Sequence, residues 1–164
     1  MMAYQVAVCG PARCGAAERE HAYRVGRLLA ERGAVVLCGG GTGVMAAVAA
    51  GARSRDGLVV GIRPGDSRAD ASPDLSVTIV TNLGEARNAV LVWSADAVIV
   101  VGGSWGTLSE LALAKRRGTV PVVSLGGWRL LDAAGRPVSG ITVADDPETA
   151  VDLALHGAPA GRPD

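Results

Sequence analysis

Short apolar runs alternate along the chain with longer stretches of helical periodicity. Runs such as Gln5–Cys9 and Ala97–Val101 are apolar at nearly every position, which is typical of strands buried on both faces of a parallel sheet. Residues 17–32 instead place apolar side chains at helical spacing and are followed by Gly33, a common helix stop. The period of the apolar positions therefore predicts strands that are mostly joined by helices.

The complete pattern predicts an α/β fold around one parallel sheet. Strands are expected at 5–9, 34–38, 58–62, 76–80, 97–101, 120–125 and near 138–143, and helices at 17–32, 44–54, 85–94, 107–117 and 147–155. Asp145 or Asp146 is placed to cap the last helix. We expect right-handed crossovers and a single-domain, doubly wound Rossmann-like sheet over residues 1–156, with helices on both faces. Residues 157–164 are rich in Pro, Gly and Ala and are expected to form a flexible tail.

Composition and charge exclude several classes of partner. Hydrophobic residues make up 49% of the chain, and its 16 basic residues equal its 16 acidic ones, so the sequence provides no overall attraction for nucleic acid or an anionic membrane. Phe is absent and aromatic residues amount to 3%, which argues against a platform on which bases stack. We therefore expect neither nucleic acid nor a membrane as partner.

The first residues and the cysteines predict a cytoplasmic location. No basic segment followed by an apolar stretch precedes the first strand, as a secretory signal requires, and no apolar run reaches the roughly 18 residues of a membrane span. Cys9, Cys14 and Cys38 lack the spacing of a zinc site and cannot all pair. We interpret them as reduced structural thiols, and we expect no metal site.

Two glycine-rich segments follow predicted strands and open predicted helices. They are Gly39-Gly40-Gly41-Thr42-Gly43, with Met45 shortly after it, and Gly102-Gly103-Ser104-Trp105-Gly106-Thr107, with Glu110 one turn farther on. Loops that follow parallel strands meet at one edge of the sheet, where Gly10 after the first strand joins them. Unpaired N–H groups at each helix start favour an anion there. The sequence therefore predicts that these loops bind a phosphorylated ligand.

The loops differ from two familiar nucleotide motifs. The first strand is followed by Gly-Pro-Ala-Arg-Cys-Gly instead of Gly-x-Gly-x-x-Gly, and Gly-Lys-Ser/Thr does not occur. The second strand also ends without an acidic residue for a ribose. An NAD-dependent enzyme and a Walker-type NTPase are therefore disfavoured.

Arg87 and Glu110 are the candidate catalytic residues. Arg87 lies in the first turn of a predicted helix, where a cation is unfavourable toward the helix dipole. A ligand phosphate can compensate for this charge, and so can an ion pair with Glu85 or Glu110. Glu110 places a carboxylate beside the expected anion site, although a first-turn carboxylate also simply favours the dipole. Trp105 could cover a flat ring, cover the helix or contact a second copy.

The two glycine motifs resemble those of the Lonely Guy-like superfamily, long labelled “possible lysine decarboxylase”. The resemblance covers about residues 4–156. Within the superfamily, the compact chain and its Gly-Gly-Ser-Trp-Gly-Thr sequence are most similar to the molybdenum-cofactor carrier proteins. A decarboxylase is not supported, because a pyridoxal enzyme needs a Schiff-base lysine. Lys115, the single lysine of the chain, falls on a helix beyond the cleft loops.

The resemblance implies two main functions. A carrier would bind, without catalysis, a pterin that has a terminal phosphate and an anionic metal-dithiolene end, with Arg87 and Arg13 or Arg63 adding positive charge. An enzyme of the cytokinin-activating branch would hydrolyse the N-glycosidic bond of a nucleoside 5′-monophosphate, releasing the base and ribose 5-phosphate. Arg87 and Glu110 match the catalytic residues of that branch. A nucleotide-sensing regulatory module is a third hypothesis.

Two departures from the enzymes favour the carrier. The enzymes have Pro-Gly-Gly where this chain has Val101-Gly102-Gly103, and their arginine is followed by lysine where this chain has Asn88. We therefore rank first a binder of molybdenum cofactor or a nucleoside monophosphate that needs no other cofactor, and leave open whether the protein is an enzyme. The resemblance also implies a homodimer or larger assembly, with which the apolar helix segment 89–93 agrees.

Overall fold

Seven parallel strands form one sheet in the order β4-β3-β2-β1-β5-β6-β7. The computed structural model describes residues 2–161. The strands are β1 (Gln5–Cys9), β2 (Val35–Cys38), β3 (Val59–Arg63), β4 (Val77–Val80), β5 (Ala97–Val101), β6 (Val122–Leu125) and β7 (Thr142–Ala144). The helices are α1 (Ala16–Glu31), α2 (Val44–Arg53), α3 (Arg87–Trp93), α4 (Trp105–Arg117) and α5 (Pro147–His156), with a short 3₁₀ helix, η1 (Gly84–Ala86), before α3.

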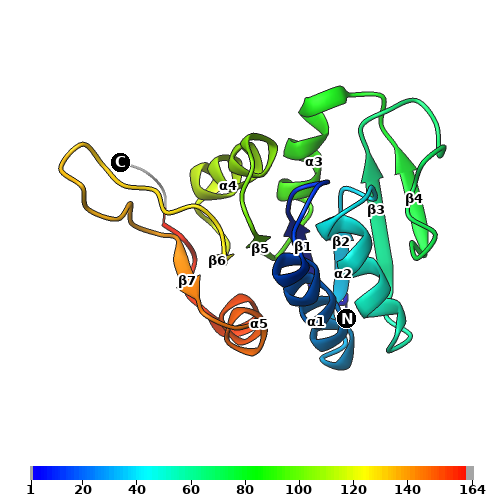
Figure 1. The fold of residues 1–164 in the computed structure, drawn as a ribbon, viewed down its shortest axis with the longest axis horizontal. Coiled ribbons are helices and arrows are strands. Elements are labelled where there is room, and N and C mark those ends of the chain that lie inside the picture. The colour runs from blue at the N-terminus through cyan, green and yellow to red at the C-terminus, as the bar shows by residue number, and fades with distance from the viewer. Residues whose placement is uncertain (1, 162–164) are drawn as a thin grey trace.

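The helices cover both faces of the sheet. Helices α1, α2 and α5 lie on one face, and α3 and α4 lie on the other (Figure 1). Successive residues of a strand point to opposite faces, so Val6 and Val8 belong to the core under α1, α2 and α5, whereas Ala7 and Cys9 belong to the core under α3 and α4. This is the doubly wound, Rossmann-like fold that the sequence predicts.

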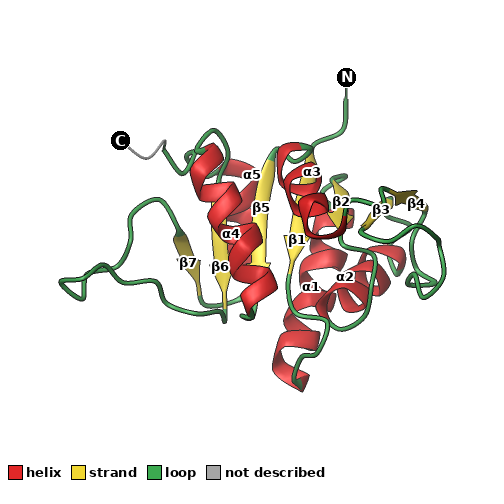
Figure 2. Cartoon of the chain, turned by 90° about the horizontal axis from the view of Figure 1, so that it is seen from above, coloured by secondary structure: helices red, strands yellow, loops and turns green. Residues whose placement is uncertain are grey.

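The order of the strands reverses between β1 and β5. The chain first builds β1 to β4 outward in one direction and then returns to place β5 on the free side of β1 (Figure 2). Cys9 at the end of β1 is in register with Val100 near the end of β5. The loops after these two strands diverge to opposite faces, which opens a crevice at the carboxyl edge.

The edges of the sheet differ most from the sequence prediction. Val77 and Ile79 of β4 are 46% and 45% exposed, because β4 is an edge strand and not a strand buried on both faces. At the opposite edge, β7 begins at Thr142 rather than near 138. Residues 126–141 before it project from the sheet (Figure 1) and are pinned by an antiparallel bridge between Leu131 and Pro137.

Helix ends follow their capping residues. Ser104 accepts a hydrogen bond from the Thr107 N–H, so α4 begins at Trp105, two residues earlier than predicted. Asp146, one of the two residues expected to cap the last helix, accepts a hydrogen bond from the Thr149 N–H. Both contacts satisfy N–H groups that have no acceptor within the helix.

The segment after α5 contacts the body of the protein up to residue 161. The Ala160 N–H donates to the Val120 carbonyl, and the Gly161 N–H donates to the Gly118 carbonyl. Lys115 donates through Nζ to the carbonyl oxygens of Ala160 and Gly161, so the single lysine of the chain holds this segment. The rest of the predicted flexible tail, residues 162–164, lies outside the described residues. Over residues 2–161, no helix has the length and apolar character needed to cross a membrane.

Helices α1 and α2 approach closely through two glycines. A Cβ on Gly51 would lie 1.9 Å from the carbonyl oxygen of Tyr23, and one on Gly26 would lie 2.1 Å from that of Val48. Only glycine permits backbones to meet at this distance. This contact sets how closely α2 packs against α1.

We expect Gly51→Ala to destabilise the protein despite the better helix propensity of alanine. Moving the two backbones apart should lower the free energy of unfolding by about 1–3 kcal/mol or more, measured by urea denaturation. Gly106→Ala is the matched control, because a Cβ there meets only Ser104 Oγ, at 4.0 Å. Equal stability of the two variants would contradict this account of the α1–α2 contact.

Candidate functional site

A cleft of about 410 Å³ lies at the carboxyl edge of the sheet. Seven of the residues predicted from the sequence line it: Gly10, Met45, Arg87, Ser104, Gly106, Thr107 and Glu110. They come from the end of β1, from the first turns of α2 and α3, and from the N-cap and first two turns of α4, with Glu110 in the second turn. Helix starts on both faces of the sheet therefore converge on one space.

The Gly39–Gly43 loop shapes the cleft from behind. A Cβ on Gly39 would lie 2.5 Å from Met45 Sδ and 2.9 Å from Arg87 Nη1, so Gly39 lets both side chains press on the backbone. Gly40 and Gly41 contact Arg63 in the same manner. Thr42 donates through Oγ1 to the Ala12 carbonyl, 3.1 Å away, which ties this loop to the loop after β1. Gly39, Gly40, Gly41 and Thr42 support the cleft but do not line it.

The second glycine loop has its cleft-facing part at the start of α4. Ser104 Oγ and Thr107 Oγ1 lie 2.9 Å apart, and both residues line the cleft with Gly106. The Trp105 and Gly106 N–H groups belong to the first turn of α4 and have no acceptor within the helix. Hydroxyls and backbone N–H groups thus occupy the wall opposite Met45.

Gly102, Gly103 and Trp105 face other neighbours. Gly102 packs against Glu18, and Gly103 packs against Trp128. Trp105 is 78% exposed and meets the ring of Trp128 edge to face, with 5.1 Å between the centroids. These residues form the outer side of the loop, next to the projecting segment 126–141, and do not line the cleft.

Arg87 is held in place by the ends of two strands. Its Nη1 donates to the carbonyl oxygens of Gly39 and Ile62, at 3.0 and 2.5 Å, and its Nε donates to Asn88 Oδ1 at 3.1 Å. Within the described part of the chain, Arg87 forms no ion pair, so neither Glu85 nor Glu110 neutralises it directly. The Nη2 group makes no hydrogen bond with any residue of 2–161 and remains available to a ligand.

Glu110 lies on α4 on the floor of the cleft and is only 8% exposed. Burial raises its pKa from 4.5 to about 7, while the Arg87 guanidinium and the Cys9 thiol partly oppose this rise. A larger fraction of Glu110 is therefore protonated at neutral pH than of an exposed carboxyl group. A neutral carboxyl group donates a hydrogen bond and does not repel an anion, whereas the carboxylate does repel one.

Several neighbours of the site were not among the residues predicted to bind or act. Cys9, predicted to be a structural thiol, is buried beside Glu110, and desolvation together with the charge of Glu110 raises its pKa. Asn88 is 7% exposed, and its Nδ2 lies 3.5 Å from Ser109 Oγ. Both residues could have been identified because each is adjacent in sequence to a predicted site residue. Cys9 precedes Gly10, and Asn88 follows Arg87. Glu85, Pro64 and Gly84 complete the rim; Arg13 and Arg63 do not line the cleft.

The fold and the paired glycine loops define a Lonely Guy-like, Rossmann-type protein. The chain belongs to the SLOG cluster4 family, whose sequence model matches residues 3–151. It is also 40% identical over 162 residues to an uncharacterised protein of Archaeoglobus fulgidus, an alignment that covers 96% of this chain and 99% of the relative. The family membership confirms the resemblance that the motifs indicate.

Known proteins with similar structures or sequences represent both functional branches. The molybdenum cofactor binding protein from Rippkaea orientalis has a TM-score of 0.83 and 34% identity, over 93% of this chain and 96% of that one. The molybdenum cofactor carrier protein from Chlamydomonas reinhardtii has a TM-score of 0.78 and 29% identity, over 94% and 97%. The cytokinin riboside 5′-monophosphate phosphoribohydrolase of Mycobacterium tuberculosis is 34% identical over 130 residues, or 74% of this chain and 70% of that enzyme.

The raised pKa of Glu110 predicts a pH-dependent stability that Glu110→Gln removes. The unfolded chain ionises this carboxyl near pH 4.5 and the folded protein near pH 7, so its contribution is present below pH 4.5 and is lost as pH rises through 7. The unfolding free energy of wild type should fall relative to that of the variant between pH 4.5 and 8, by about 3 kcal/mol at most. Denaturation curves across this range measure the difference.

Glu85→Gln is the control, since Glu85 is an exposed carboxylate on the rim of the same cleft. Its stability profile should run parallel to that of wild type. A parallel profile for Glu110→Gln as well would show that Glu110 ionises at the same pH in the folded and unfolded states.

Proposed function

We propose that this protein binds a small phosphorylated ligand in the cleft and that the ligand is molybdenum cofactor or a closely similar pterin. The observation that carries the proposal is the state of Arg87: backbone carbonyls and Asn88 fix its guanidinium, and Nη2 has no partner among residues 2–161. An arginine oriented in advance loses little freedom when it binds a phosphate. The unpaired donor thus supports binding of a ligand anion beside Arg87.

The remaining walls suit the same ligand. Ser104 and Thr107 offer hydroxyls, and the first N–H groups of α4 offer further donors to an anion. Met45 and Pro64 supply apolar surface for a ring system. A volume of about 410 Å³ is within the range common for small-molecule sites. The names of the two similar solved proteins support molybdenum cofactor as the ligand.

Hydrolysis of a nucleoside 5′-monophosphate is the second candidate. Arg87 and Glu110 both line the cleft, and each affects the pKa of the other. A carboxyl group with a pKa near 7 suits general acid–base catalysis, and the identity to the phosphoribohydrolase supports this candidate. Asn88 favours the binder, because it orients Arg87 through Oδ1 and adds no second positive charge.

A cytoplasmic location and the absence of nucleic-acid partners belong to the same proposal. Cys9, Cys14 and Cys38 are free, and two of them are buried. Free thiols are typical of proteins in reducing compartments. A small cleft with one oriented arginine suits a ligand of low molecular weight better than a nucleic-acid backbone.

Substitutions of Arg87 and Glu110, together with an assay of base release, test binding and separate the two candidate functions. Arg87→Gln should weaken binding of a nucleoside monophosphate or pterin phosphate at least about tenfold, because it removes a charged donor; calorimetry measures the change. If the protein is a hydrolase, wild type should release free base from a panel of nucleoside 5′-monophosphates, and Glu110→Gln should abolish release but retain binding. Binding without release in wild type would contradict the hydrolase and favour a non-catalytic binder.

Arg13→Gln is the matched control, because Arg13 is exposed and does not line the cleft. It should change neither binding nor base release. If Arg87→Gln binds as tightly as this control, the proposed role of Arg87 is wrong.

We also propose that the protein forms a homodimer through α3. On this helix, Leu91 and Val92 are buried, but Val90 is 36% and Trp93 62% exposed, and Leu83, which precedes η1, is 50% exposed. Arg117 lies 5.1 Å from the centroid of the Trp93 ring and donates to the Val92 carbonyl, so this apolar surface is held rigidly. Neighbouring exposed apolar side chains of this kind are common at protein interfaces.

Val90→Asp should convert a dimer into a monomer of 16.5 kDa, because a buried, unpaired carboxylate opposes association. Light scattering at micromolar concentration gives the mass. Leu131→Asp is the control, since Leu131 is 57% exposed on the distant segment 126–141 and should leave the dimer intact. A monomeric wild type would disprove the interface.

A further inference from the structure

Two adjoining cavities lie at the β6–β7 end of the sheet, apart from the cleft. The smaller, of about 120 Å³, is lined mostly by the projecting segment 126–141, and the larger, of about 280 Å³, lies where β6 and β7 end. They adjoin because Ser124, Arg129 and Val143 line both. Over residues 2–161, neither cavity shares a lining residue with the cleft. A ligand in these cavities is therefore distinct from the one proposed for the cleft.

The smaller cavity is almost entirely apolar. Its walls include the side chains of Leu130, Val138 and Ile141 from the projecting segment and of Leu111 from α4, together with the ring of Trp128. An apolar cavity of about 150 Å³ is known to hold a benzene molecule, so this slightly smaller space suits one aromatic ring. The indole of Trp128 offers such a ring an aromatic neighbour.

Ser124 is a buried polar residue where the two cavities meet. It is only 5% exposed. Because Val123 and Leu125 point into the core under α1, α2 and α5, strand alternation turns Ser124 toward α4. A Cβ on Gly127 would lie 3.1 Å from Ser124 Oγ, which places the hydroxyl against the loop after β6. This Oγ forms no hydrogen bond with any residue of 2–161. A buried hydroxyl without a partner is unfavourable, so a polar ligand group is favoured beside it.

Arg129 brings a positive charge to the same junction. It is exposed, lines both cavities and forms no ion pair within residues 2–161. The planar guanidinium group of arginine matches the geometry of a carboxylate. His21 and Asp145 line the larger cavity only, and the carboxylate of Asp145 opposes a ligand with several negative charges. The junction therefore suits a single carboxylate group.

We propose that the two cavities form a binding site for a small aromatic carboxylate. The ring occupies the apolar cavity beside Trp128, and the carboxylate lies at the junction, where it accepts hydrogen bonds from Ser124 Oγ and Arg129. Apolar walls with a few convergent polar groups are typical of small-molecule sites. The proposal is independent of the function proposed for the cleft, because the two sites have no lining residue in common within residues 2–161.

An NMR titration of isotope-labelled wild type with benzoate tests the site. Saturable binding should shift the amide signals of residues 126–131 and 138–143 and leave those of residues 39–45 unchanged. Benzyl alcohol keeps the ring but lacks the charge, and acetate keeps the carboxylate but lacks the ring. Each should bind at least about tenfold more weakly than benzoate. Equal affinity for benzoate and acetate, or no saturable shift with benzoate, would overturn the proposal.

Two variants test the polar contacts separately. Arg129→Gln should weaken benzoate binding at least about tenfold but change benzyl alcohol binding by less than about twofold, because only benzoate offers a charged acceptor. Ser124→Ala should weaken benzoate binding about fivefold. It should not lower the temperature of thermal unfolding, because the hydroxyl has no partner within residues 2–161 that the substitution removes.

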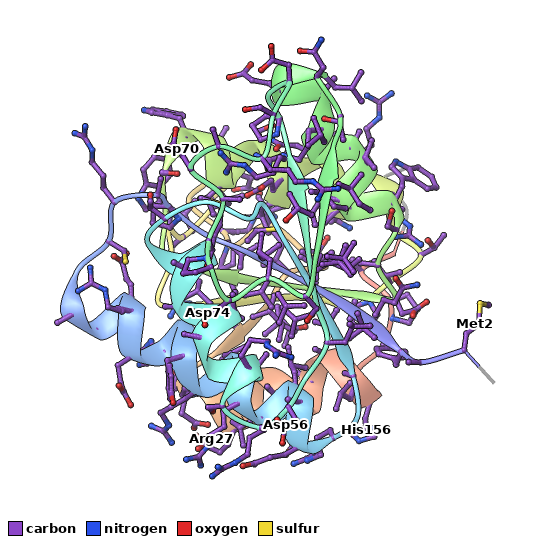
Figure 3. All side chains as sticks on the ribbon, turned by 90° about the vertical axis from the view of Figure 1, so that its right-hand side faces the viewer. Met2, Arg27, Asp56, Asp70, Asp74 and His156 are labelled. Atoms are coloured by element: carbon purple, nitrogen blue, oxygen red, sulfur yellow. The ribbon has the colours of Figure 1, made fainter. Side chains whose placement is uncertain are left out.

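Arg68→Gln is the matched control for Arg129→Gln. Arg68 is an exposed arginine that, like Asp70 and Asp74 (Figure 3), belongs to the connection between β3 and β4, at the opposite edge of the sheet. It should bind benzoate as wild type does, and an equal affinity of Arg129→Gln would show that the assignment of Arg129 is wrong. If benzoate does not bind and the signals of residues 126–141 shift on dilution of the free protein, a second copy covers this surface and the proposal fails.

Discussion

The hydrogen bonds of Arg87 to the ends of β2 and β3 are the contact on which the site depends. The carbonyl oxygens of Gly39 and Ile62 lie at the carboxyl edge of the sheet. The Nη1 group of Arg87 donates a hydrogen bond to each of them. This fixes the start of α3 over the strands and orients the guanidinium before a ligand arrives. Gly39 accommodates the contact, since a Cβ there would lie 2.5 Å from Met45 Sδ and 2.9 Å from Arg87 Nη1 and would displace these side chains.

Among residues 2–161, no ion pair balances the charge of Arg87 at this contact. Arg87 and Arg63 bring two guanidinium groups to one loop, and the acidic residue beside them, Glu110, is buried enough that its pKa rises to about 7. The protonated fraction of Glu110 cannot neutralise Arg87. An anionic ligand, as proposed above, would supply an acceptor for the Nη2 group of Arg87.

The fold could be predicted from the sequence because its signals are local. Apolar runs such as that of β5 can only be buried on both faces, and Ser104 and Asp146 mark helix starts through their own side chains. The edge strands could not be predicted in the same way, since Val77 and Ile79 are as apolar as core residues and only their position in the sheet exposes them. Edge position depends on strand order, which apolar periodicity does not encode.

The site was predictable at the level of loops but not of contacts. The motifs identify the loops that meet at the carboxyl edge, yet Trp105 turns outward to Trp128, a residue 23 positions later on segment 126–141. The compensation of Arg87 by strand-end carbonyls has no sequence signature at all, because any residue supplies a carbonyl. For Arg63, the sequence identifies the positive charge. It does not reveal that Nε is buried without a hydrogen-bond partner, because this depends on the packing. Binding and hydrolysis therefore share the same sequence motif, and the contacts of Arg87 with Asn88 and of Glu110 with Cys9 emerge only from the packing.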